Sequence, residues 1–249
     1  MQQSRRSLKY LLTKTWTRII PNARHLARSR FRTCRACLRP SVFIAIGADE
    51  EFHICIRCRA NLRYELLAQY VRRNAPHLEY LDVLELDPGS PLQPILRAAR
   101  RYTRSFFRPD VEPGSRRVDG VVCEDITRLT FGEASLDLIV SSDVLEHVPD
   151  PAAAFRESAR VLRPGGVHIF TVPPKSVTRQ RAALDQGGIK ILVDPPEYHW
   201  DPLDPAGVLV YWEYGSDLAR VFPTPGLQFR VAEGPEGVSG RIVWEAKRV

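Results

Sequence analysis

The chain has 249 residues, of which 44% are hydrophobic and 26% are charged, so it is long enough for one large core plus a small additional module. This composition excludes a disordered chain and a collagen-like one. The formal charge is +7, but residues 1–80 hold 16 Lys/Arg against 5 Asp/Glu, whereas the rest of the chain is mildly acidic. A basic extension on an acidic body indicates a docking element more than a protein that binds nucleic acid throughout.

The first 32 residues contain nine Lys/Arg and no acid. Apolar residues recur at helical spacing from Leu8 to Ile20 until Pro21, which predicts a short basic amphipathic helix. Such a helix suits packing on the protein body or docking on a partner protein, and peripheral binding to an anionic membrane is the alternative. The opening Arg5-Arg6 pair is not expected to be an export signal, because Lys14 and Arg18 interrupt the apolar stretch that should follow.

No apolar run approaches the roughly 20 residues that a membrane-spanning helix needs, so the sequence predicts a soluble protein. Four of the five cysteines form two C-x-x-C pairs, and in a chain without a secretory signal such pairs favour metal over disulfides. We therefore expect a cytoplasmic location. Cys123, the fifth cysteine, ends a predicted buried strand and is expected to be a core residue.

The two cysteine pairs have the spacing of a zinc ribbon, with 17 residues between Cys37 and Cys55. Four thiolates complete a tetrahedral shell around Zn²⁺ and leave no position for water, so the zinc should be structural. His53 is an alternative ligand, although the complete set of cysteines disfavours it. Direct nucleic-acid binding is not expected, because aromatic residues for base stacking do not interleave with the cysteines. The predicted zinc ligands are Cys34, Cys37, Cys55 and Cys58.

Strand and helix patterns then alternate. A linking helix is expected at 61–73, strands at 80–86, 118–123, 136–141 and 167–172, and a weaker strand near 101–107. Helices are expected within 92–101 and from Asp150, which can cap its helix with Ala152, Phe155, Ala159 and Leu162 on one face before the turn at Pro164-Gly165-Gly166. This order predicts parallel βαβ units, followed by an irregular stretch at 173–216 and an antiparallel pair at 228–232 and 241–246. The expected fold is a doubly wound, mostly parallel seven-stranded α/β sheet.

Residues 136–172, LDLIVSSDVLEHVPDPAAAFRESARVLRPGGVHIFTV, resemble the fourth-to-fifth-strand region of class I S-adenosylmethionine-dependent methyltransferases. The Glu-His pair after the strand, the Asp-Pro helix start and the Leu-Arg-Pro-Gly-Gly turn carry this resemblance. With the upstream cysteines and the downstream Pro-Glu-Tyr-His and Tyr-Gly-x-Asp-Leu segments, the chain is similar to bacterial methyltransferases with an N-terminal zinc ribbon. The domains implied are an extension at 1–32, a ribbon at 33–60, a linking helix at 61–79 and a methyltransferase domain at 80–249, whose insertion near 173–216 would cap the substrate.

The resemblance implies S-adenosylmethionine as cofactor. It puts Glu85 at the end of the first strand, followed by the cofactor loop with Leu86, Asp87 and Gly89, and it has Asp125 bond the adenine amine while Ile126 makes an apolar contact. Ser142, Asp143 and His147 would line the crevice, with His147 as the candidate general base and Asp143 or Glu146 orienting it.

Two departures from the family pattern are visible. Asp87 and Pro91 stand where the first and third loop glycines would be, and the acid that usually holds the ribose has no clear counterpart, since Phe106 occupies its position and Asp110 follows four residues later. The alternative function is therefore a degenerate methyltransferase fold that serves as a binding or scaffold protein. Other nucleotide-binding α/β enzymes are disfavoured, because no G-x-G-x-x-G or P-loop is present.

The residues do not identify the acceptor: a saccharide, a lipid-linked glycan or a small metabolite is favoured, and a protein or an RNA is the alternative. His199 lies in the segment after the fifth predicted strand, where substrate lids form. With the nearby aromatic residues it indicates either ring stacking against a substrate or closure of the core; these residues are Tyr198, Trp200, Tyr211, Trp212 and Tyr214.

Overall fold

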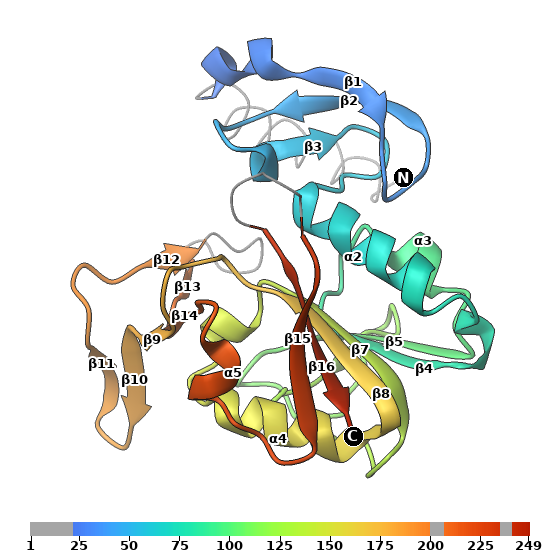
Figure 1. Cartoon of the computed structure of the whole chain (residues 1–249). Helices are drawn as coiled ribbons and strands as arrows, with labels where there is room; N and C mark the ends of the chain where they lie inside the picture. Colours follow the sequence, from blue (N-terminus) through green and yellow to red (C-terminus); the bar gives the residue numbers. More distant parts are fainter. Residues whose placement is uncertain (1–21, 200–206, 235–240) are drawn as a thin grey trace. The chain divides into compact units, whose positions relative to one another are not determined.

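The computed structural model describes residues 22–199, 207–234 and 241–249 (Figure 1). The predicted amphipathic helix at Leu8–Ile20 lies outside these residues. The chain divides into two compact units, residues 1–69 and residues 70–249. Within the described part of the chain, no helix is long and apolar enough to cross a membrane.

The first unit holds a small antiparallel sheet in the order β1-β2-β3, with β1 at Arg30–Thr33, β2 at Pro40–Ala45 and β3 at His53–Cys55. Two short 3-10 helices, η2 (Ala23–Arg28) and η3 (Glu50–Phe52), flank the strands. Helix α2 (Leu62–Asn74), close to the predicted linking helix, begins in this unit and continues into the second. Glu65 of α2 is buried and accepts hydrogen bonds from the Arg32 guanidinium at 2.6 and 2.7 Å, which ties the helix to the sheet.

The second unit is built on a seven-stranded sheet in the order β15-β16-β8-β7-β4-β5-β6. The neighbouring strands from β8 to β6 run parallel, whereas β16 is antiparallel to both β8 and β15. The strands are β4 (Asp82–Glu85), β5 (Arg101–Phe106), β6 (Val122–Cys123), β7 (Leu136–Ser142), β8 (Leu162–Thr171), β15 (Leu227–Glu233) and β16 (Val243–Arg248). This is the mostly parallel seven-stranded sheet that the sequence predicts.

Helices cover both faces of this sheet. Helix α4 (Pro151–Val161) buries Phe155 against Phe170 of β8, in a core cluster that includes Trp244 of β16. Successive side chains of a strand point to opposite faces, so Glu245 lies on the other face from Trp244. There it accepts a hydrogen bond from the hydroxyl of Tyr70 on α2. The doubly wound arrangement is therefore confirmed.

Helix α4 begins where the sequence predicts, but the set of side chains that it buries differs in part from the predicted set. The Asp150 carboxylate accepts a hydrogen bond from the Ala153 amide at 2.9 Å, and Pro151 occupies the first turn. The predicted apolar face was partly wrong, because Ala152 and Ala159 are only half-buried. The helix instead buries Pro151, Ala154, Phe155, Ser158 and Val161.

Three element boundaries differ from the prediction. The expected strand at 118–123 shrinks to β6, because a turn at Asp119-Gly120, with Gly120 at a φ of 79°, folds the preceding residues back so that Arg116 bridges Val122. The predicted helix within 92–101 is only α3 (Gln93–Leu96). The expected turn at Pro164-Gly165-Gly166 is absorbed into β8, where the register with β7 shifts between Leu136 and Leu138.

The segment expected to be irregular, 173–216, forms short strands. These are β9 (Arg179–Gln180), β10 (Ala182–Asp185), β11 (Gly188–Ile191), β12 (Tyr198–His199), β13 (Val208–Leu209) and β14 (Trp212–Glu213), paired as β9 with β14, β10 with β11 and β12 with β13. Short helices precede or follow this region at η4 (Leu78–Tyr80), η5 (Leu145–His147) and α5 (Leu218–Val221). The segment therefore brings residues 198–199 beside residues 208–209.

Candidate functional site

The residues predicted to bind the cofactor all follow the carboxyl ends of parallel strands. Glu85 ends β4, Asp125 comes two residues after β6, and Ser142 ends β7. In open α/β sheets, ligands bind in the crevice at this edge. The fold therefore places these residues, as the strand pattern predicts, on the edge that can hold a ligand.

Glu85 is a buried acid at the start of the loop. It is 1% exposed and accepts hydrogen bonds from the hydroxyl of Tyr102, on the adjacent strand β5, and from the side chain of Ser90. Burial raises the pKa of Glu85 to about 7 against the opposing effect of these two hydrogen bonds. Because this pKa is close to neutral pH, a change in the surroundings of the carboxyl group would change its charge.

The loop after Glu85 turns without the two missing glycines. Asp87 stands at the first glycine position, and its Oδ1 accepts a hydrogen bond from the Gly89 amide at 2.8 Å. An aspartate that bonds the backbone two residues later builds a turn through its own side chain. The carbonyl of Pro88 accepts hydrogen bonds from Gln93 at 3.1 Å and Arg104 at 3.2 Å, which fix the loop further.

Gly89 itself is not required by the backbone. Its φ is not in the left-handed region, and a Cβ built there would have only the Asp87 carboxylate nearby, at 3.8 Å. The volume beside Gly89 therefore stays open in the folded chain. Open space next to backbone is what a closely approaching ligand would use.

Asp125 and Ile126 differ in exposure. Asp125 is half-buried, and its Oδ1 accepts from the Thr127 amide at 2.8 Å and the Thr127 hydroxyl at 2.7 Å. Within the part of the chain that the structure describes, no group donates a hydrogen bond to its Oδ2. Ile126 is 6% exposed and lies in the same core cluster as Phe155, with Leu86 packed against that cluster.

Ser142 and Asp143 lie where β7 ends. The Thr171 hydroxyl approaches the Ser142 hydroxyl at 3.3 Å and donates to Asp143 Oδ1 at 3.0 Å. Asp143 has a φ of 52° and accepts hydrogen bonds at 2.8 and 2.9 Å from Arg241, a residue that the sequence analysis did not single out. Arg241 lies 98 positions from Asp143 in the sequence, so no local motif could predict that the two residues pair. This ion pair fixes the Asp143 carboxylate.

Glu146 and His147 of η5 lie close to His199 of β12. His199 Nδ1 lies 3.6 Å and His147 Nε2 lies 3.9 Å from Glu146 Oε1, and the two imidazole rings meet edge to face with centroids 5.0 Å apart. Glu146 is 1% exposed, and among the described residues neither of its carboxylate oxygens has a hydrogen-bond partner. Burial raises the pKa of Glu146, and the adjacent Glu146 carboxylate raises the pKa of His199. The sequence indicated His147 and His199 separately, but no spacing motif predicted that they would meet.

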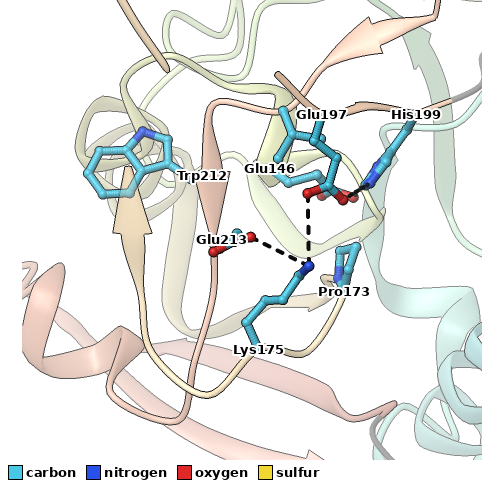
Figure 2. Close-up of a pocket in the computed structure, with 8 residues that line it drawn as sticks. Glu146, Pro173, Lys175, Glu197, His199, Trp212 and Glu213 are labelled. Carbon is cyan, nitrogen blue, oxygen red and sulfur yellow. Dashed lines mark hydrogen bonds and ion pairs between the residues drawn. The ribbon is translucent and has the colours of Figure 1, made fainter. Parts of the chain in front are cut away.

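A small pocket opens beside this cluster (Figure 2). Figure 2 shows the carboxylates of Glu146 and Glu197 close to the His199 ring, with the Lys175 amine reaching toward both Glu197 and Glu213. The pocket lining consists of Glu146, Pro173, Lys175, Glu197, His199, Val210, Trp212 and Glu213. Most of these residues come from the segment 173–216, so that segment forms most of the pocket wall.

Asp110 is the acid that follows the expected position of the ribose ligand most closely in the sequence, and its side chain pairs with Arg108. Its carboxylate accepts hydrogen bonds from the Arg108 guanidinium at 2.6 and 2.9 Å, and both side chains are exposed. The position four residues earlier, Phe106, is buried in a small core cluster.

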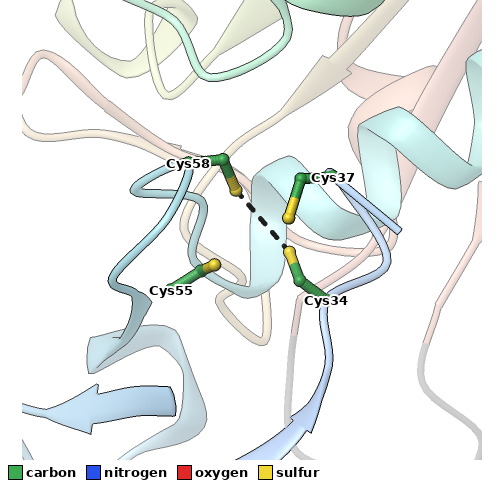
Figure 3. Close-up of side chains that lie close together, drawn as sticks. All are labelled: Cys34, Cys37, Cys55 and Cys58. Carbon is green, nitrogen blue, oxygen red and sulfur yellow. Dashed lines mark hydrogen bonds between the residues drawn. The ribbon is translucent and has the colours of Figure 1, made fainter. Parts of the chain in front are cut away.

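The four cysteines of the C-x-x-C pairs lie together (Figure 3). Their sulfur atoms all lie within 4.8 Å of one another, and Cys34 Sγ is 3.6 Å from Cys58 Sγ. Four thiolates about 2.3 Å from one tetrahedral zinc ion would be about 3.8 Å apart. This donor set and this geometry fit zinc. Cys123 lies away from them in a core cluster with Phe106, as predicted.

The two C-x-x-C loops repeat one backbone arrangement. The backbone carbonyl of Cys34 accepts a hydrogen bond from the amide of Leu38, and the backbone amide of Cys34 donates one to the carbonyl of Arg39. In the second loop, the carbonyl of Cys55 accepts from the amide of Arg59, and the amide of Cys55 donates to the carbonyl of Ala60. Leu38 and Arg59 both have left-handed φ values, 57° and 68°. Each loop therefore wraps its backbone around the first cysteine of its pair and presents both thiols to the same point. Ser41 also lies within hydrogen-bond distance of Cys55, with 3.1 Å between Oγ and Sγ.

Comparison with known proteins gives one family match. Residues 86–170, about a third of the chain, match the family model described as a methyltransferase domain. This segment has the sequence pattern of a methyltransferase. It begins in the loop after β4 and ends in β8, so it includes Gly89, Asp125, Ser142 and His147.

The curated relatives agree over short stretches. The chain is 38% identical over 112 residues to a malonyl-[acyl-carrier protein] O-methyltransferase of Methylovorus sp. (strain MP688), which covers 45% of this chain and 36% of that protein. It is 39% identical over 49 residues to a ubiquinone biosynthesis O-methyltransferase of Coxiella burnetii, covering 20% of this chain and 21% of that protein. The chain thus spans at most about a third of the length of these relatives.

Solved structures resemble the fold at low identity. An S-adenosylmethionine-dependent methyltransferase from Mesorhizobium loti shares 18% identity at a TM-score of 0.44, covering 73% of this chain and 97% of that one. The complex of the Haloferax volcanii Trm112 methyltransferase activator with a methyltransferase contains a chain with 16% identity and a TM-score of 0.45, covering 75% and 90%.

Proposed function

We propose that this protein transfers a methyl group from S-adenosylmethionine to an acceptor bound at the carboxyl edge of the seven-stranded sheet. The observation that carries the proposal is that the segment matching the methyltransferase family, 86–170, spans the loops that end β4, β6 and β7. A sheet of this kind binds its ligands at that edge. S-adenosylmethionine would supply the methyl group, and methyl transfer needs chiefly positioning and exclusion of water from the protein.

Within this proposal, Asp125 would hold the adenine. Its Oδ1 is occupied by Thr127, which orients the carboxylate and leaves Oδ2 as the acceptor for an exocyclic amine. Ile126 is fixed in the core and would present only the small exposed part of its side chain. Glu85 and the loop with Leu86, Asp87 and Gly89 would surround the charged amino-acid end of the cofactor, where a buried carboxylate balances an ammonium group.

His147 would act as general base only through Nε2. The Leu209 carbonyl lies 2.9 Å from Nδ1 and can only accept, so the hydrogen resides on Nδ1 in the neutral ring. That leaves Nε2 with a lone pair. Asp143 is paired with Arg241, whereas Glu146, among the acids that the structure describes, has a carboxylate oxygen placed against Nε2, at 3.9 Å. A base of this kind is required only if the acceptor must lose a proton.

The acceptor is proposed to react through oxygen. Both curated relatives named above are called O-methyltransferases, although they match over only part of their length. Saccharides, lipid-linked glycans and small hydroxylated metabolites all satisfy this requirement.

We further propose that the protein works in the cytoplasm, that Cys34, Cys37, Cys55 and Cys58 hold a structural zinc ion, and that the basic N-terminal segment docks on a partner protein or a membrane surface.

Calorimetric titration with S-adenosylmethionine tests the central claim. We expect saturable binding with micromolar affinity, reduced at least tenfold in Asp125→Ala, because the adenine amine would lose its acceptor. Asp110→Ala is the matched control, since Asp110 also follows a strand but pairs with the exposed Arg108, and its affinity should stay within about twofold of the unchanged chain.

No detectable binding by the folded, zinc-loaded protein would overturn the proposal. That outcome would favour the second candidate, a degenerate methyltransferase fold that acts as a binding or scaffold protein. The observations behind this candidate are the replacement of two loop glycines by Asp87 and Pro91 and the engagement of Asp110 with Arg108.

A further inference from the structure

We propose that Glu146, His147 and His199 form a second metal site, which binds a divalent transition-metal ion. The three potential ligand atoms all lie within 4.8 Å of one another. They come from η5 and from β12, which are more than 50 positions apart in the sequence. This site is separate from the four cysteines, which belong to the first unit of the chain.

The unsatisfied carboxylate of Glu146 is the first argument. A carboxylate that is 1% exposed and has no hydrogen-bond partner costs free energy in the fold. Buried charges in proteins are paired or coordinate metals. Two imidazole nitrogens lie close to its Oε1, but beyond hydrogen-bond distance at 3.6 and 3.9 Å.

The outer contacts of the two histidines are the second argument. His147 places Nδ1 2.9 Å from the Leu209 carbonyl, and His199 places Nε2 3.2 Å from a Glu197 carboxylate oxygen. Each acceptor holds the ring hydrogen on the nitrogen that faces it, so the other nitrogen keeps its lone pair. Metal-binding histidines have this arrangement, with one nitrogen on the metal and the other donating to a carbonyl or a carboxylate. Here both remaining nitrogens, His147 Nε2 and His199 Nδ1, face Glu146.

The spacing fits an ion after a small contraction. Ligands about 2.0–2.2 Å from a divalent ion lie about 3.0–3.5 Å from each other. The two separations from Glu146 Oε1, 3.6 and 3.9 Å, exceed the upper end of this range by a few tenths of an ångström, and the two imidazole nitrogens lie within 4.8 Å of each other. Two imidazoles and one carboxylate suit zinc, iron, cobalt or manganese better than magnesium or calcium, which prefer oxygen ligands alone.

Three protein ligands leave coordination positions for water or for an oxygen of another molecule. Glu146 and His199 also line the pocket of Figure 2, so an ion bound here would form part of its wall. On the proposed function, such an ion would bind a hydroxyl-bearing acceptor and lower the pKa of its hydroxyl group, and it would replace His147 as the group that activates the acceptor, because His147 Nε2 is then a metal ligand and cannot accept a proton. This consequence rests on the proposed function, whereas the metal site itself does not.

Cobalt titration of the full chain, first saturated with one equivalent of zinc, tests the site. Co²⁺ bound by nitrogen and oxygen gives visible d–d absorption without the thiolate charge-transfer band that the cysteines would add. We expect one equivalent of Co²⁺ with this nitrogen and oxygen signature in the unchanged protein. His199→Gln and His147→Gln should each abolish it, and Glu197→Ala, which removes the outer contact of His199 together with the ion pairs of Glu197 to Lys175 and Arg181, should weaken Co²⁺ binding about 10–100-fold.

His77→Gln is the matched control, because His77 is exposed and its Nδ1 lies 3.4 Å from the carboxylate of the exposed Glu79; the Co²⁺ affinity of this variant should not change. Thermal unfolding of each variant without Co²⁺ shows whether it folds, and His199→Gln decides the matter if His147→Gln does not. The inference is overturned if the zinc-loaded protein gives no such band at millimolar Co²⁺, or if the band survives in folded His199→Gln. The titration contains no S-adenosylmethionine, so its failure is distinguishable from a failure to bind cofactor.

Discussion

The pKa values of two acids at opposite ends of β4 are shifted in opposite directions. Asp82, at the amino end, is buried, and hydrogen bonds from Arg101, Arg100 and Arg163 hold its pKa well below the usual range. Glu85, at the carboxyl end, has its pKa raised by burial to about 7. Asp82 therefore keeps its charge and fixes the strand, whereas Glu85 can gain or lose a proton near neutral pH.

The first prediction concerns Glu85 and pH. Because its pKa is higher in the folded chain than in the unfolded one, the folded state binds more protons between the ordinary pKa of a glutamate and about 7. Stability from this group is therefore complete at low pH and falls as pH rises through that window, by at most about 3 kcal/mol. Glu85→Gln should remove this component.

Urea unfolding of the unchanged chain and of Glu85→Gln, from pH 4.5 to 8, measures the effect. The difference between the two free energies of unfolding should shift in favour of the variant as pH rises. A pH-independent difference would contradict the assignment of a raised pKa to Glu85.

The second prediction concerns Gly89. Because a Cβ at this position meets no atom closer than 3.8 Å, Gly89→Ala should change the free energy of unfolding by no more than about 0.5 kcal/mol. If the cofactor occupies that open volume, its affinity should fall at least tenfold. Calorimetric titration beside thermal unfolding separates the two effects.

Gly166→Ala provides the contrast. A Cβ there would lie 2.9 Å from the Arg163 carbonyl and 3.1 Å from the Asp137 carbonyl, so this variant should lose stability. Unchanged cofactor affinity in a stable Gly89→Ala variant would remove the loop from the binding site.

At the level of elements, helix α4 depends on its cap. Asp150→Ala removes the acceptor for the Ala153 amide and should lower the free energy of unfolding by about 1 kcal/mol, while Asp150→Ser should retain most of it. Denaturant unfolding checks both variants. Equal losses in alanine and serine would mean that the Asp150 charge, which lies 3.8 Å from Arg156, matters more than the cap.

The order of elements was predictable from sequence because it depends on local patterns. The cap and Pro151 predicted the start of α4, and apolar runs predicted β4, β7 and both last strands. The start of the strand expected at 118–123 was not predictable, because a turn at Gly120 overrides the apolar pattern around it.

The site was predictable only where chain neighbours define it. Strand ends predicted the placement of Glu85, Asp125 and Ser142, and cysteine spacing predicted the cluster of four thiols. The meeting of Glu146 with His199, and of Asp143 with Arg241, depends on how distant segments return to the sheet. Weak periodicity in 173–216 gave no means to predict that return.

For the whole molecule, metal removal should act on the two units differently. The three strands of the first unit bury only Ser41, Phe43, Ala45, His53 and Cys55, so a zinc ion held by the four cysteines should supply much of the stability of this sheet. Chelation with a strong zinc ligand should expose the amides of β1, β2 and β3 to hydrogen exchange. The amides of β4, β7 and β8, in a separate compact unit with its own core, should stay protected.

Cys37→Ser should reproduce the effect of chelation without any chelator. Protection of β1–β3 that survives zinc removal would show that the small sheet folds on apolar contacts alone.

The outer strand β15 has a consequence for how the protein behaves in crowded solution. The seven-stranded sheet is open at β6, which has two residues, and at β15, which has seven, so only β15 is long enough to recruit a strand from another molecule. Its register with β16 shifts between Val231 and Glu233, and the exposed Arg230 donates a hydrogen bond to Glu245 of β16 at 2.8 Å. An interrupted register and charged side chains discourage edge-to-edge association. These features of β15 should therefore oppose aggregation through strand addition at this edge of the sheet.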